Sequence, residues 1–410
     1  MSDPSSSIVL SYQHAAAVVR RALERVRTAK RPVERVALTA AAGRVLAEPV
    51  LADRDQPPFA KATRDGYACR AANVQAGGLR VLGVLRAGEG WAQGAIRPGE
   101  AVEIMTGAAV PAGADCVVMV EHVTLVEGRV SLTGPRAIGV GENIVPAGAE
   151  ARSGDVVVPA GQRMGAAQIA AAAACGATDL PVFSRPRVAI LATGDELVEA
   201  GEKPLAHQIR NSNSYSLAAQ VAAAGGEPEV FPIVRDDRAE TERAIEKATG
   251  LDVVVLSGGV SMGKFDLVEQ ALLTLGAEFF FTGVRMQPGK PVVFGRLREV
   301  CFFGLPGNPI STMVTFALFV APLVRGLGGE SSCGPHFGMA RLEEEVRVSA
   351  GLTRFLPARV ESDVHGARVR RIEWHGSGDL AAGVRANGFL VVPETAERLP
   401  AGEIVSVLEI

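Results

Sequence analysis

The chain has 410 residues, of which 48% are hydrophobic, and its formal net charge at pH 7 is −3. This length predicts two to four domains, and the apolar content is sufficient for several buried cores. The near balance of charges gives no basic surface of the kind that nucleic-acid partners require.

The cysteines and the apolar runs indicate a soluble, cytoplasmic protein. The five cysteines are scattered without CxxC spacing, so no zinc site or disulfide framework is expected and a reducing cytosol fits best. The segment from Met1 to Ser7 lacks the basic and apolar regions of a signal peptide. The longest apolar run, residues 166–175, is shorter than the roughly twenty residues that a membrane span needs. No membrane partner is therefore expected.

The first part of the chain predicts helical segments around a β-rich insert. Residues 11–29 carry apolar side chains at helical spacing, and Ser11 is a candidate N-cap. Residues 51–149 are rich in glycine and proline and predict a compact β-rich insert. The flanking pieces, 1–50 and 150–183, predict one discontinuous helical domain. Strand-like runs within the insert are residues 79–85, 101–105, 116–120 and 129–132.

Residues 184–328 alternate strand-like and helical segments, which predicts an α/β domain with a mostly parallel sheet. Apolar runs follow at 188–193, 229–234, 252–256, 292–294 and 300–304. Asn213 or Ser214 is expected to cap one helix, and Asp236 or Asp237 the next. Short alternating segments from about residue 337 onward predict a small β-barrel or sandwich, so that residues 329–410 form a separate C-terminal domain.

Three glycine-rich loops follow three of these runs and predict one anion site. Ligands of open α/β sheets bind outside the carboxyl ends of the strands. Glycines let the backbone N–H groups approach a ligand closely, and a helix N-terminus adds positive partial charge. A phosphate or another oxyanion is therefore the expected ligand. The loop residues are Thr193 and Gly194, then Ser257, Gly258, Gly259 and Ser261, then Pro306, Gly307, Asn308, Pro309 and Ser311.

Acidic residues at the same strand ends predict a metal ion. Glu196, Asp236 and Asp266 fall at or just after predicted strand ends. Carboxylates repel a bare phosphate, so a hard cation such as Mg²⁺ between acid and phosphate explains them. Capping is the alternative for Asp236 and Asp266, because acids favour the first turn of a helix. For Asp236 both interpretations are equally supported, whereas function is favoured for Glu196 and Asp266.

Two further charged residues stand in turns. Lys290, next to Gly289 in a proline-flanked turn, is well placed to meet an oxyanion as a point charge, although a solvated loop lysine is an equal alternative. Asp65, in Arg64-Asp65-Gly66-Tyr67, is by itself typical of an ordinary turn. The chain contains no complete Walker loop and no GxGxxG fingerprint, which disfavours P-loop ATPases and dehydrogenases.

These motifs, in this order, resemble those of the molybdopterin molybdenumtransferases, enzymes of molybdenum cofactor biosynthesis that share their architecture with the E domain of gephyrin. The resemblance covers nearly the whole chain, and the ordered set is far more specific than any one motif. The matching segments are residues 65–68, 104–108, 111–115, 141–144, 193–197, 211–214, 257–261, 288–291, 305–309, 376–378 and 386–388.

The resemblance implies a fold and a reaction. The family combines a discontinuous elongated helical domain, a β-rich insert, an α/β molybdopterin-binding domain and a C-terminal β-barrel. Its members insert molybdenum from molybdate into adenylylated molybdopterin and release AMP, with Mg²⁺ assisting. They are homodimers in which the insert of one chain faces the α/β domain of the other, and a contact with the adenylyltransferase of the pathway is expected.

The resemblance also assigns roles to individual residues. The acidic site residues are Asp65, Glu196, Asp236 and Asp266, the last three as metal ligands. Lys290, Ser261 and the glycine-rich loops hold phosphate and molybdate.

Several positions depart from the family pattern. Gln287 and Asn211 replace a common lysine and a common aspartate, and Arg64 replaces a common methionine. Residues 145–150, Val-Pro-Ala-Gly-Ala-Glu, replace a basic stretch that ends in Gly-Glu-Asp. Both molybdate and tungstate remain compatible with these residues.

Two other functions were weighed against molybdenum insertion. The first is the molybdopterin adenylyltransferase of the same pathway, which uses ATP and the same kind of α/β domain. The second is a non-catalytic pterin-binding scaffold. The long flanking segments and Asp65 favour the molybdenum-inserting enzyme.

Overall fold

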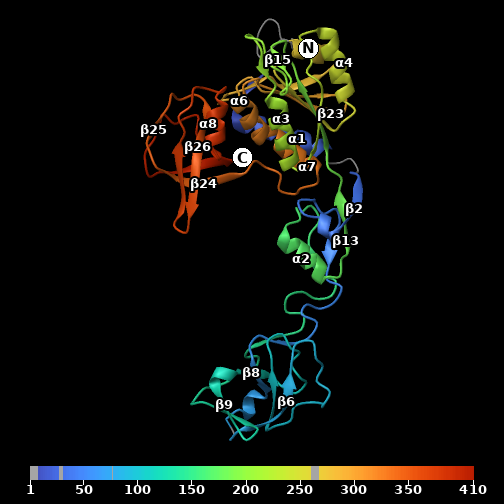
Figure 1. Cartoon of the computed structure of the whole chain (residues 1–410), viewed down its shortest axis with the longest axis vertical. Helices are drawn as coiled ribbons and strands as arrows, with labels where there is room; N and C mark the ends of the chain where they lie inside the picture. The colour runs from blue at the N-terminus through green and yellow to red at the C-terminus, as the bar shows by residue number, and fades with distance from the viewer. Residues whose placement is uncertain (1–7, 27–30, 76, 260–266) are drawn as a thin grey trace.

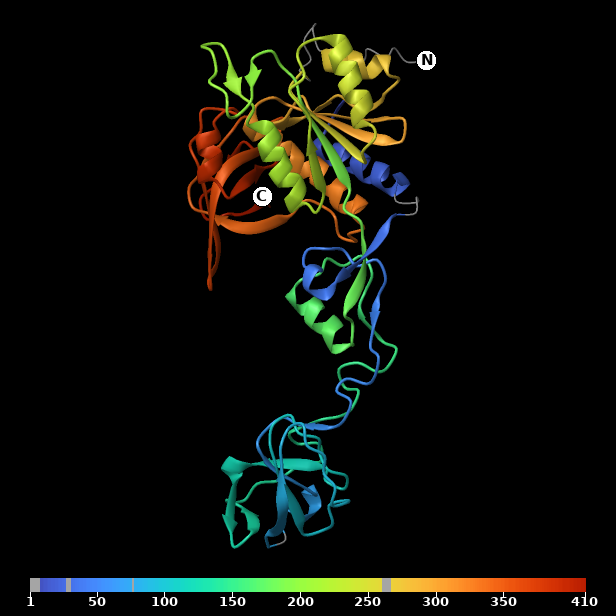
Figure 2. The same cartoon turned by 45° about the vertical axis from the view of Figure 1, so that its right-hand side comes forward.

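The computed structural model describes residues 8–26, 31–75, 77–259 and 267–410, and the molecule is strongly elongated (Figure 1). The insert, residues 51–149, lies at one end. The head, residues 187–410 together with the first helix, lies at the other end. A slender arm, residues 31–50 and 150–183, joins the two, as the view turned by 45° also shows (Figure 2).

The insert is built on one six-stranded sheet in the order β8-β5-β7-β6-β10-β9. Its strands include all four runs expected from the sequence, within one residue at either end. Buried Tyr67 and Ala68 of β5 place the turn that carries Asp65 directly beside this sheet. The strands are β5 (Gly66–Cys69), β6 (Leu79–Leu85), β7 (Glu100–Ile104), β8 (Cys116–Met119), β9 (Val123–Val126) and β10 (Arg129–Leu132).

The arm is made of paired strands from the two chain segments and one short helix. β2 (Val33–Ala37) pairs with β13 (Asp179–Phe183), and β3 (Val50–Leu51) pairs with β12 (Val156–Val158). The alanine-rich helix α2 (Ala166–Ala174) covers one side and is followed by Gly176 at φ +80°. The buried apolar residues of the arm form a cluster separate from those of the head.

The first helix packs on the head. α1 spans Tyr12–Val26, and the Ser11 hydroxyl accepts a hydrogen bond from the His14 N–H at 3.3 Å, which confirms Ser11 as the N-cap. Ala15, Val19 and Leu23 are buried on the face that contacts α7 (Ala321–Leu327). The sequence boundary of 1–50 thus includes a helix that packs on the head, and only its later residues lie in the arm.

The head contains the mostly parallel α/β sheet that the sequence predicts. Its strand order is β17-β14-β18-β23-β22-β19, with β17, β14, β18 and β23 parallel to one another and β22 and β19 antiparallel. Both faces of the sheet are buried by helices. The strands are β14 (Arg187–Ala192), β17 (Glu227–Val230), β18 (Val253–Ser257), β19 (Glu278–Phe281), β22 (Val293–Leu297) and β23 (Val300–Leu305).

Two local expectations for the head are wrong, and the structure decides a third, the choice between two helix caps. The strand expected over 229–234 ends at Val230, because Pro232 has no N–H to donate to the ladder. Helix α3 (Asn213–Ala223) begins after Ser212, so neither Asn213 nor Ser214 is its N-cap. The Asp237 carboxylate accepts a hydrogen bond from the Glu240 N–H at 2.8 Å and caps α4 (Arg238–Ala248).

The C-terminal region is a closed β-barrel, as expected. Five strands follow one another in the order β26-β27-β24-β30-β28, and the pairing of β28 with β26 closes the ring. The two-residue strand β21 (Met286–Gln287) joins β26 from outside. The short helix α8 (Leu380–Arg385), capped by Asp379, was not expected from the alternating pattern. The barrel strands are β24 (Phe337–Leu342), β26 (Thr353–Asp363), β27 (Gly366–Arg371), β28 (Gly388–Val392) and β30 (Ile404–Glu409).

One helical stretch of the head is long and apolar enough, by composition, to cross a membrane. It runs from Pro309 to Leu327 and comprises α6 (Pro309–Thr315), a π-helical turn (Phe316–Val320) and α7. Inside the protein, 83% of this window is buried. Packing in the core of the head therefore accounts for its apolar composition.

The contact between α1 and α7 gives the first testable prediction. A side chain at Gly326 of α7 would collide with the Leu23 side chain of α1. Gly326→Ala should lower the free energy of unfolding by about 1–3 kcal/mol, because overpacking forces backbone shifts or strained rotamers. Chemical denaturation measures the effect, and Gly201→Ala, which meets no atom within 4 Å, is the control. Equal stability of both variants would contradict this close approach.

Candidate functional site

The three glycine-rich loops of the head lie at one edge of its sheet. Ala192 of β14 is in register with Ser257 of β18, and Ser257 is in register with Leu305 of β23. The strands therefore end at the same level, and the loops that follow them are neighbours. A side chain on Gly307 would lie 3.7 Å from the Cα of Gly258, so two of the loops nearly touch.

Two adjoining cavities open at this edge. The first, about 330 Å³, is lined by Thr193, Gly194, Glu196, Asp236 and Gly259 among others. The second, about 450 Å³, shares Thr193 and Glu196 with the first. It is further lined by the residues Ser257, Gly258, Gly307, Asn308, Pro309 and Asn213.

The first cavity brings together two of the acids that were predicted as metal ligands. Asp237 caps α4, so capping does not explain Asp236, whose side chain faces the cavity that Glu196 also lines. At Gly194, φ is +144°, a conformation that favours glycine. The Glu196 carboxylate lies close to the space that a side chain would occupy there.

The same cavity contains a polar atom without a partner. The Thr193 hydroxyl is buried and, in the part of the chain that the structure describes, has no hydrogen-bond partner. A side chain on Gly259 would lie 2.8 Å from this oxygen, so the hydroxyl fills the space that the glycine leaves. Burying an unpaired hydroxyl costs free energy, about 1–3 kcal/mol, which a bound ligand would offset.

The donor set fits a hard cation. Two carboxylates and a hydroxyl are oxygen ligands, and Mg²⁺ is commonly bound through one or two carboxylates plus substrate phosphates. The residues described contain no group of three His, Cys, Asp or Glu side chains that could hold a metal by themselves. Asp266 and Ser261, two of the predicted site residues, lie outside the described residues.

Asn213, which the sequence suggested as a helix cap within the family motif 211–214, links two of the loops. Asn213 Nδ2 donates hydrogen bonds to Ser257 Oγ at 2.9 Å and to the Gly307 carbonyl oxygen at 2.7 Å. It thereby connects α3 to the ends of β18 and β23. No periodicity signals such a contact, because it joins three segments far apart in the sequence.

The barrel also contributes to the site, which the sequence did not predict. Asn308 Nδ2 donates to Ser377 Oγ at 2.8 Å, and the Ile310 N–H donates to the Ser377 carbonyl oxygen at 2.9 Å. Gly378 and Leu380 line the second cavity. The loop before α8 therefore closes one side of the site.

Two of the predicted loop residues lie beneath the cavities instead of lining them. Ser311 is 4% exposed within α6. The Pro306 carbonyl oxygen accepts a hydrogen bond from the Thr312 hydroxyl at 2.6 Å. Both residues fix the turn in which Gly307 and Asn308 face the ligand space.

Lys290 lies at the same edge of the sheet but lines neither cavity. Val293 of β22 pairs with Gly304 near the end of β23, so the turn before β22 reaches the site edge. Gly289, at φ +104°, packs this turn against Thr315, and the Lys290 side chain is exposed. Arg354 of the barrel donates to Gln287 Oε1 at 3.0 Å, which places a buried guanidinium where the family pattern has lysine.

Within one chain, the insert that carries Asp65 lies far from the head that carries the other acids (Figures 1 and 2). Its Oδ1 accepts hydrogen bonds from the Thr106 N–H at 2.7 Å and the Thr106 hydroxyl at 2.8 Å. These bonds lower the pKa of Asp65 from 3.8, so the carboxylate is ionised at neutral pH. Glu150 ends the stretch 145–150 that departs from the family pattern. Its Oε1 forms an ion pair with Lys61 Nζ at 3.2 Å.

The fold defines a multidomain protein with an α/β domain whose glycine-rich loops meet at one sheet edge, and comparisons with known proteins specify its family. Residues 10–176 match the family described as the MoeA N-terminal region (domain I and II), residues 189–326 the probable molybdopterin binding domain, and residues 339–410 the MoeA C-terminal region (domain IV). The chain belongs to the molybdopterin molybdenumtransferase family.

Individual relatives match over most of their length. A molybdopterin molybdenumtransferase of Nostoc sp. is 36% identical over 92% of this chain and 88% of its own. Two crystal structures of molybdopterin biosynthesis MoeA protein from Pyrococcus horikoshii are similar. One is 35% identical, with a TM-score of 0.71, and covers 95% of this chain and 98% of its own. The other is 28% identical, with a TM-score of 0.77, and covers 98% of this chain and 100% of its own.

The Asn213 bridge gives the second prediction. Asn213→Ala removes both hydrogen bonds and releases the turn at Gly307 from Ser257. We expect the affinity of the folded protein for AMP, a nucleotide fragment of the expected substrate, to fall about tenfold. Isothermal titration calorimetry measures this.

The matched control is Asn387→Ala in the barrel. That amide also ties backbone segments together, accepting from the Val360 N–H at 2.7 Å and donating to the Val360 carbonyl oxygen at 2.9 Å. It lies outside both cavities, so AMP affinity should not change. Wild-type affinity in folded Asn213→Ala would show that the bridge does not shape the site.

Proposed function

We propose that this protein is a transferase that inserts molybdenum from molybdate into adenylylated molybdopterin, releasing AMP and forming molybdenum cofactor. The structural observation that carries the proposal is the first cavity. It combines the carboxylates of Glu196 and Asp236 with the buried Thr193 hydroxyl, which has no hydrogen-bond partner among the residues that the structure describes, beside glycine-rich turns. Relatives with this activity in their names match along nearly the whole chain.

The glycine turns would bind the phosphates of the substrate. The Gly258 N–H donates to the Leu305 carbonyl oxygen at 3.2 Å, so the Gly307 turn would supply the backbone donors, and the Asn213 amide keeps the two turns together. Thr193 would offer its hydroxyl as a donor. The phosphoanhydride between AMP and the phosphate of molybdopterin breaks as a water oxygen bonds to phosphorus, so that AMP and molybdopterin each keep a complete phosphate. Two Mo–S bonds form to the dithiolene as molybdate gives up two oxygens, which leave as water with the thiol protons and protons from solvent.

Glu196 and Asp236 would hold Mg²⁺ in this proposal, together with Asp266. When bound, the ion neutralises phosphate charge and makes the phosphorus more electrophilic. Lys290, in the turn at the same edge of the sheet, would meet molybdate as a point charge.

Asp65 would act in the site of a second chain. The arm holds the insert at the far end of the molecule (Figure 1), so Asp65 is remote from Glu196 and Asp236 of its own chain. A two-fold homodimer in which each insert faces the partner's head would give two equivalent sites. The ionised carboxylate of Asp65 would then lie on the metal or molybdate side of the substrate.

The proposal places the protein in the cytoplasm. Its cysteines are unpaired, including Cys69 and Cys116, whose sulfur atoms lie 3.6 Å apart without a disulfide. It would receive its substrate from the adenylyltransferase of the pathway by direct contact. Neither nucleic acid nor a membrane is part of this proposal.

The adenylyltransferase and scaffold alternatives are less well supported. Relatives named molybdopterin molybdenumtransferase match the arm, the insert and the barrel as well as the α/β part of the head. An adenylyltransferase that works through the α/β part alone has no use for Asp65.

AMP release tests the proposal and gives the third prediction. With adenylylated molybdopterin, molybdate and Mg²⁺, the protein should release AMP without consuming ATP. Glu196→Gln removes a charge that stabilises the transition state, so turnover should fall by roughly a hundredfold. Chromatographic detection of AMP measures it.

Glu199→Gln is the control for this experiment. Glu199 lies close by in sequence and accepts a hydrogen bond from the Tyr215 hydroxyl at 3.4 Å, outside both cavities. It should keep wild-type turnover. ATP consumption by the wild type, or full activity of Glu196→Gln, would contradict the proposed reaction.

A further inference from the structure

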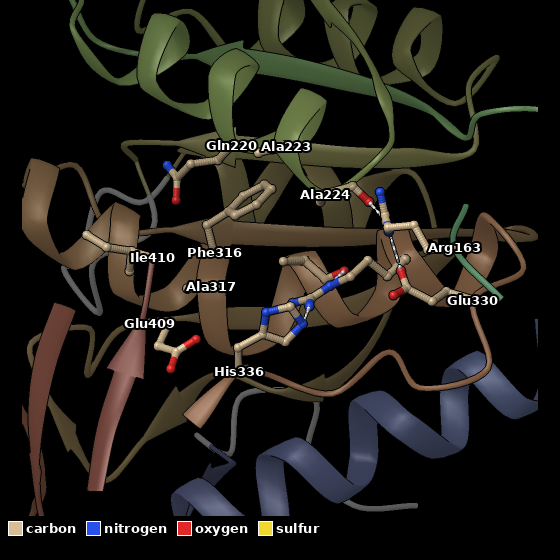
Figure 3. A pocket seen from close by; sticks show the side chains of 12 residues that line it. Arg163, Gln220, Ala223, Ala224, Phe316, Ala317, Glu330, His336, Glu409 and Ile410 are labelled. Carbon is tan, nitrogen blue, oxygen red and sulfur yellow. Dashed lines mark hydrogen bonds and ion pairs between the residues drawn. The ribbon is translucent and has the colours of Figure 1, made fainter. Parts of the chain in front are cut away.

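One arginine crosses from the arm to the head. Arg163 stands in the arm between β12 and α2, and its guanidinium reaches three segments (Figure 3). Nη1 donates to the Gly43 carbonyl oxygen of the arm at 3.1 Å. Nη2 donates to the Ala224 carbonyl oxygen, at the end of α3 in the head, at 3.2 Å. Nε and Nη2 both donate to Glu330 Oε2, at 3.3 and 2.8 Å.

Glycines make room for this contact on both sides. Gly225 follows the helix end that Arg163 binds and has φ +87°, and a side chain there would lie 3.0 Å from Arg163 Nη2. The Ser331 N–H of the head donates to the Gly161 carbonyl oxygen of the arm at 2.9 Å, and a side chain on Gly161 would collide with Ser331. The two surfaces are therefore shaped to each other at two separate places.

A cavity of about 320 Å³ lies beside the contact, and Arg163 and Glu330 form one end of it. Gln220, Phe316 and Glu409 of the head are among the other residues that line it (Figure 3). One aromatic contact also crosses the junction, since a side chain on Gly329 of the head would collide with the Phe183 ring of the arm. The buried apolar clusters of the arm and the head are nevertheless separate. Units joined without a large apolar interface are expected to move relative to each other, so the polar contacts of Arg163 contribute to setting their angle.

We infer that Arg163 is a positioning residue that locks the arm to the head and thereby sets where the insert carries Asp65. Its planar fork suits this role, because a guanidinium can bind several acceptors in one fixed geometry. Lysine offers a single charged point on a flexible stem and would hold the angle less well.

The length of the arm amplifies any change at this junction. The insert lies at the far end of the molecule (Figures 1 and 2), so a small rotation at Arg163 displaces Asp65 much further than it displaces the junction. Misplacement of a catalytic group by 1 Å can cost roughly a hundredfold in rate. The functional part of the inference rests on the proposed role of Asp65 in a partner's site.

Distances between spin labels test the lock directly. Val156 of the arm and Val230 of the head are 57% and 46% exposed and can be replaced by cysteine in a Cys333→Ser background. The labelled full-length chain is mixed with an excess of unlabelled chain, so that only intrachain distances are recorded. Arg163→Ala should broaden the distance distribution to about twice its width or more, and Arg163→Lys should give an intermediate width.

Arg35→Ala is the matched control. Arg35 forms an ion pair with Asp179 across β2 and β13, inside the arm, and its hydrogen bond within the described residues goes to the same carboxylate. Its removal should leave the wild-type width. Wild-type width in Arg163→Ala would overturn the inference, and if that variant does not fold, wild-type width in Arg163→Lys does the same.

Measurements of AMP release distinguish the fixed arm–head angle from its proposed role in placing Asp65. Arg163→Ala should lower AMP release by roughly a hundredfold, while its affinity for AMP alone stays at the wild-type level, because the cavities of the head are intact. Arg35→Ala should change neither. A broadened distribution with full turnover would confirm the lock and contradict the need for a fixed Asp65.

Discussion

The register of three parallel strands is the constraint on which the rest of the structure depends. Because β14, β18 and β23 end at the same level, three turns that are distant in sequence meet at one edge of the sheet. Glycine at these turns lets the backbones approach one another closely, and Glu196, which follows β14, lines the same cavity as Asp236, which follows β17. The cavity of Thr193, Glu196 and Asp236 is a consequence of that alignment. A shift of β18 by one residue would separate the loops and turn its side chains to the opposite face.

The elongated shape imposes the second constraint. The chain places one ionised carboxylate, Asp65, at the end of an arm and the other acids in the head (Figure 1). Thr106 donates two hydrogen bonds to that carboxylate and so favours its charged form. A site divided in this way needs both a second chain and a stiff arm. In this account the Arg163 contact keeps the arm at a fixed angle to the head. The proposed homodimer then places Asp65 of one chain beside the acids of the other.

Much of this architecture could be predicted from sequence patterns, and the exceptions have physical causes. Apolar runs fixed the central strands, since buried parallel strands are apolar on both faces. The choice between Asp236 and Asp237 as helix cap needed the position of one N–H group, that of Glu240. Asn213 and Arg163 were missed as links because their hydrogen bonds join segments far apart in the chain, which no local pattern encodes. The metal-ligand roles of Glu196 and Asp236 and the role of Lys290 stay predictions.

Complementation between two inactive variants tests most directly whether the two halves of the site come from different chains. Asp65→Ala and Glu196→Ala homodimers should each lack AMP release. Under subunit exchange, a verified heterodimer contains one site with both defects and one intact site, so about half of the wild-type turnover per dimer should return. Double-tag purification isolates this heterodimer, and AMP release measures its activity. Heterodimers as inactive as their parents would contradict a site shared between chains.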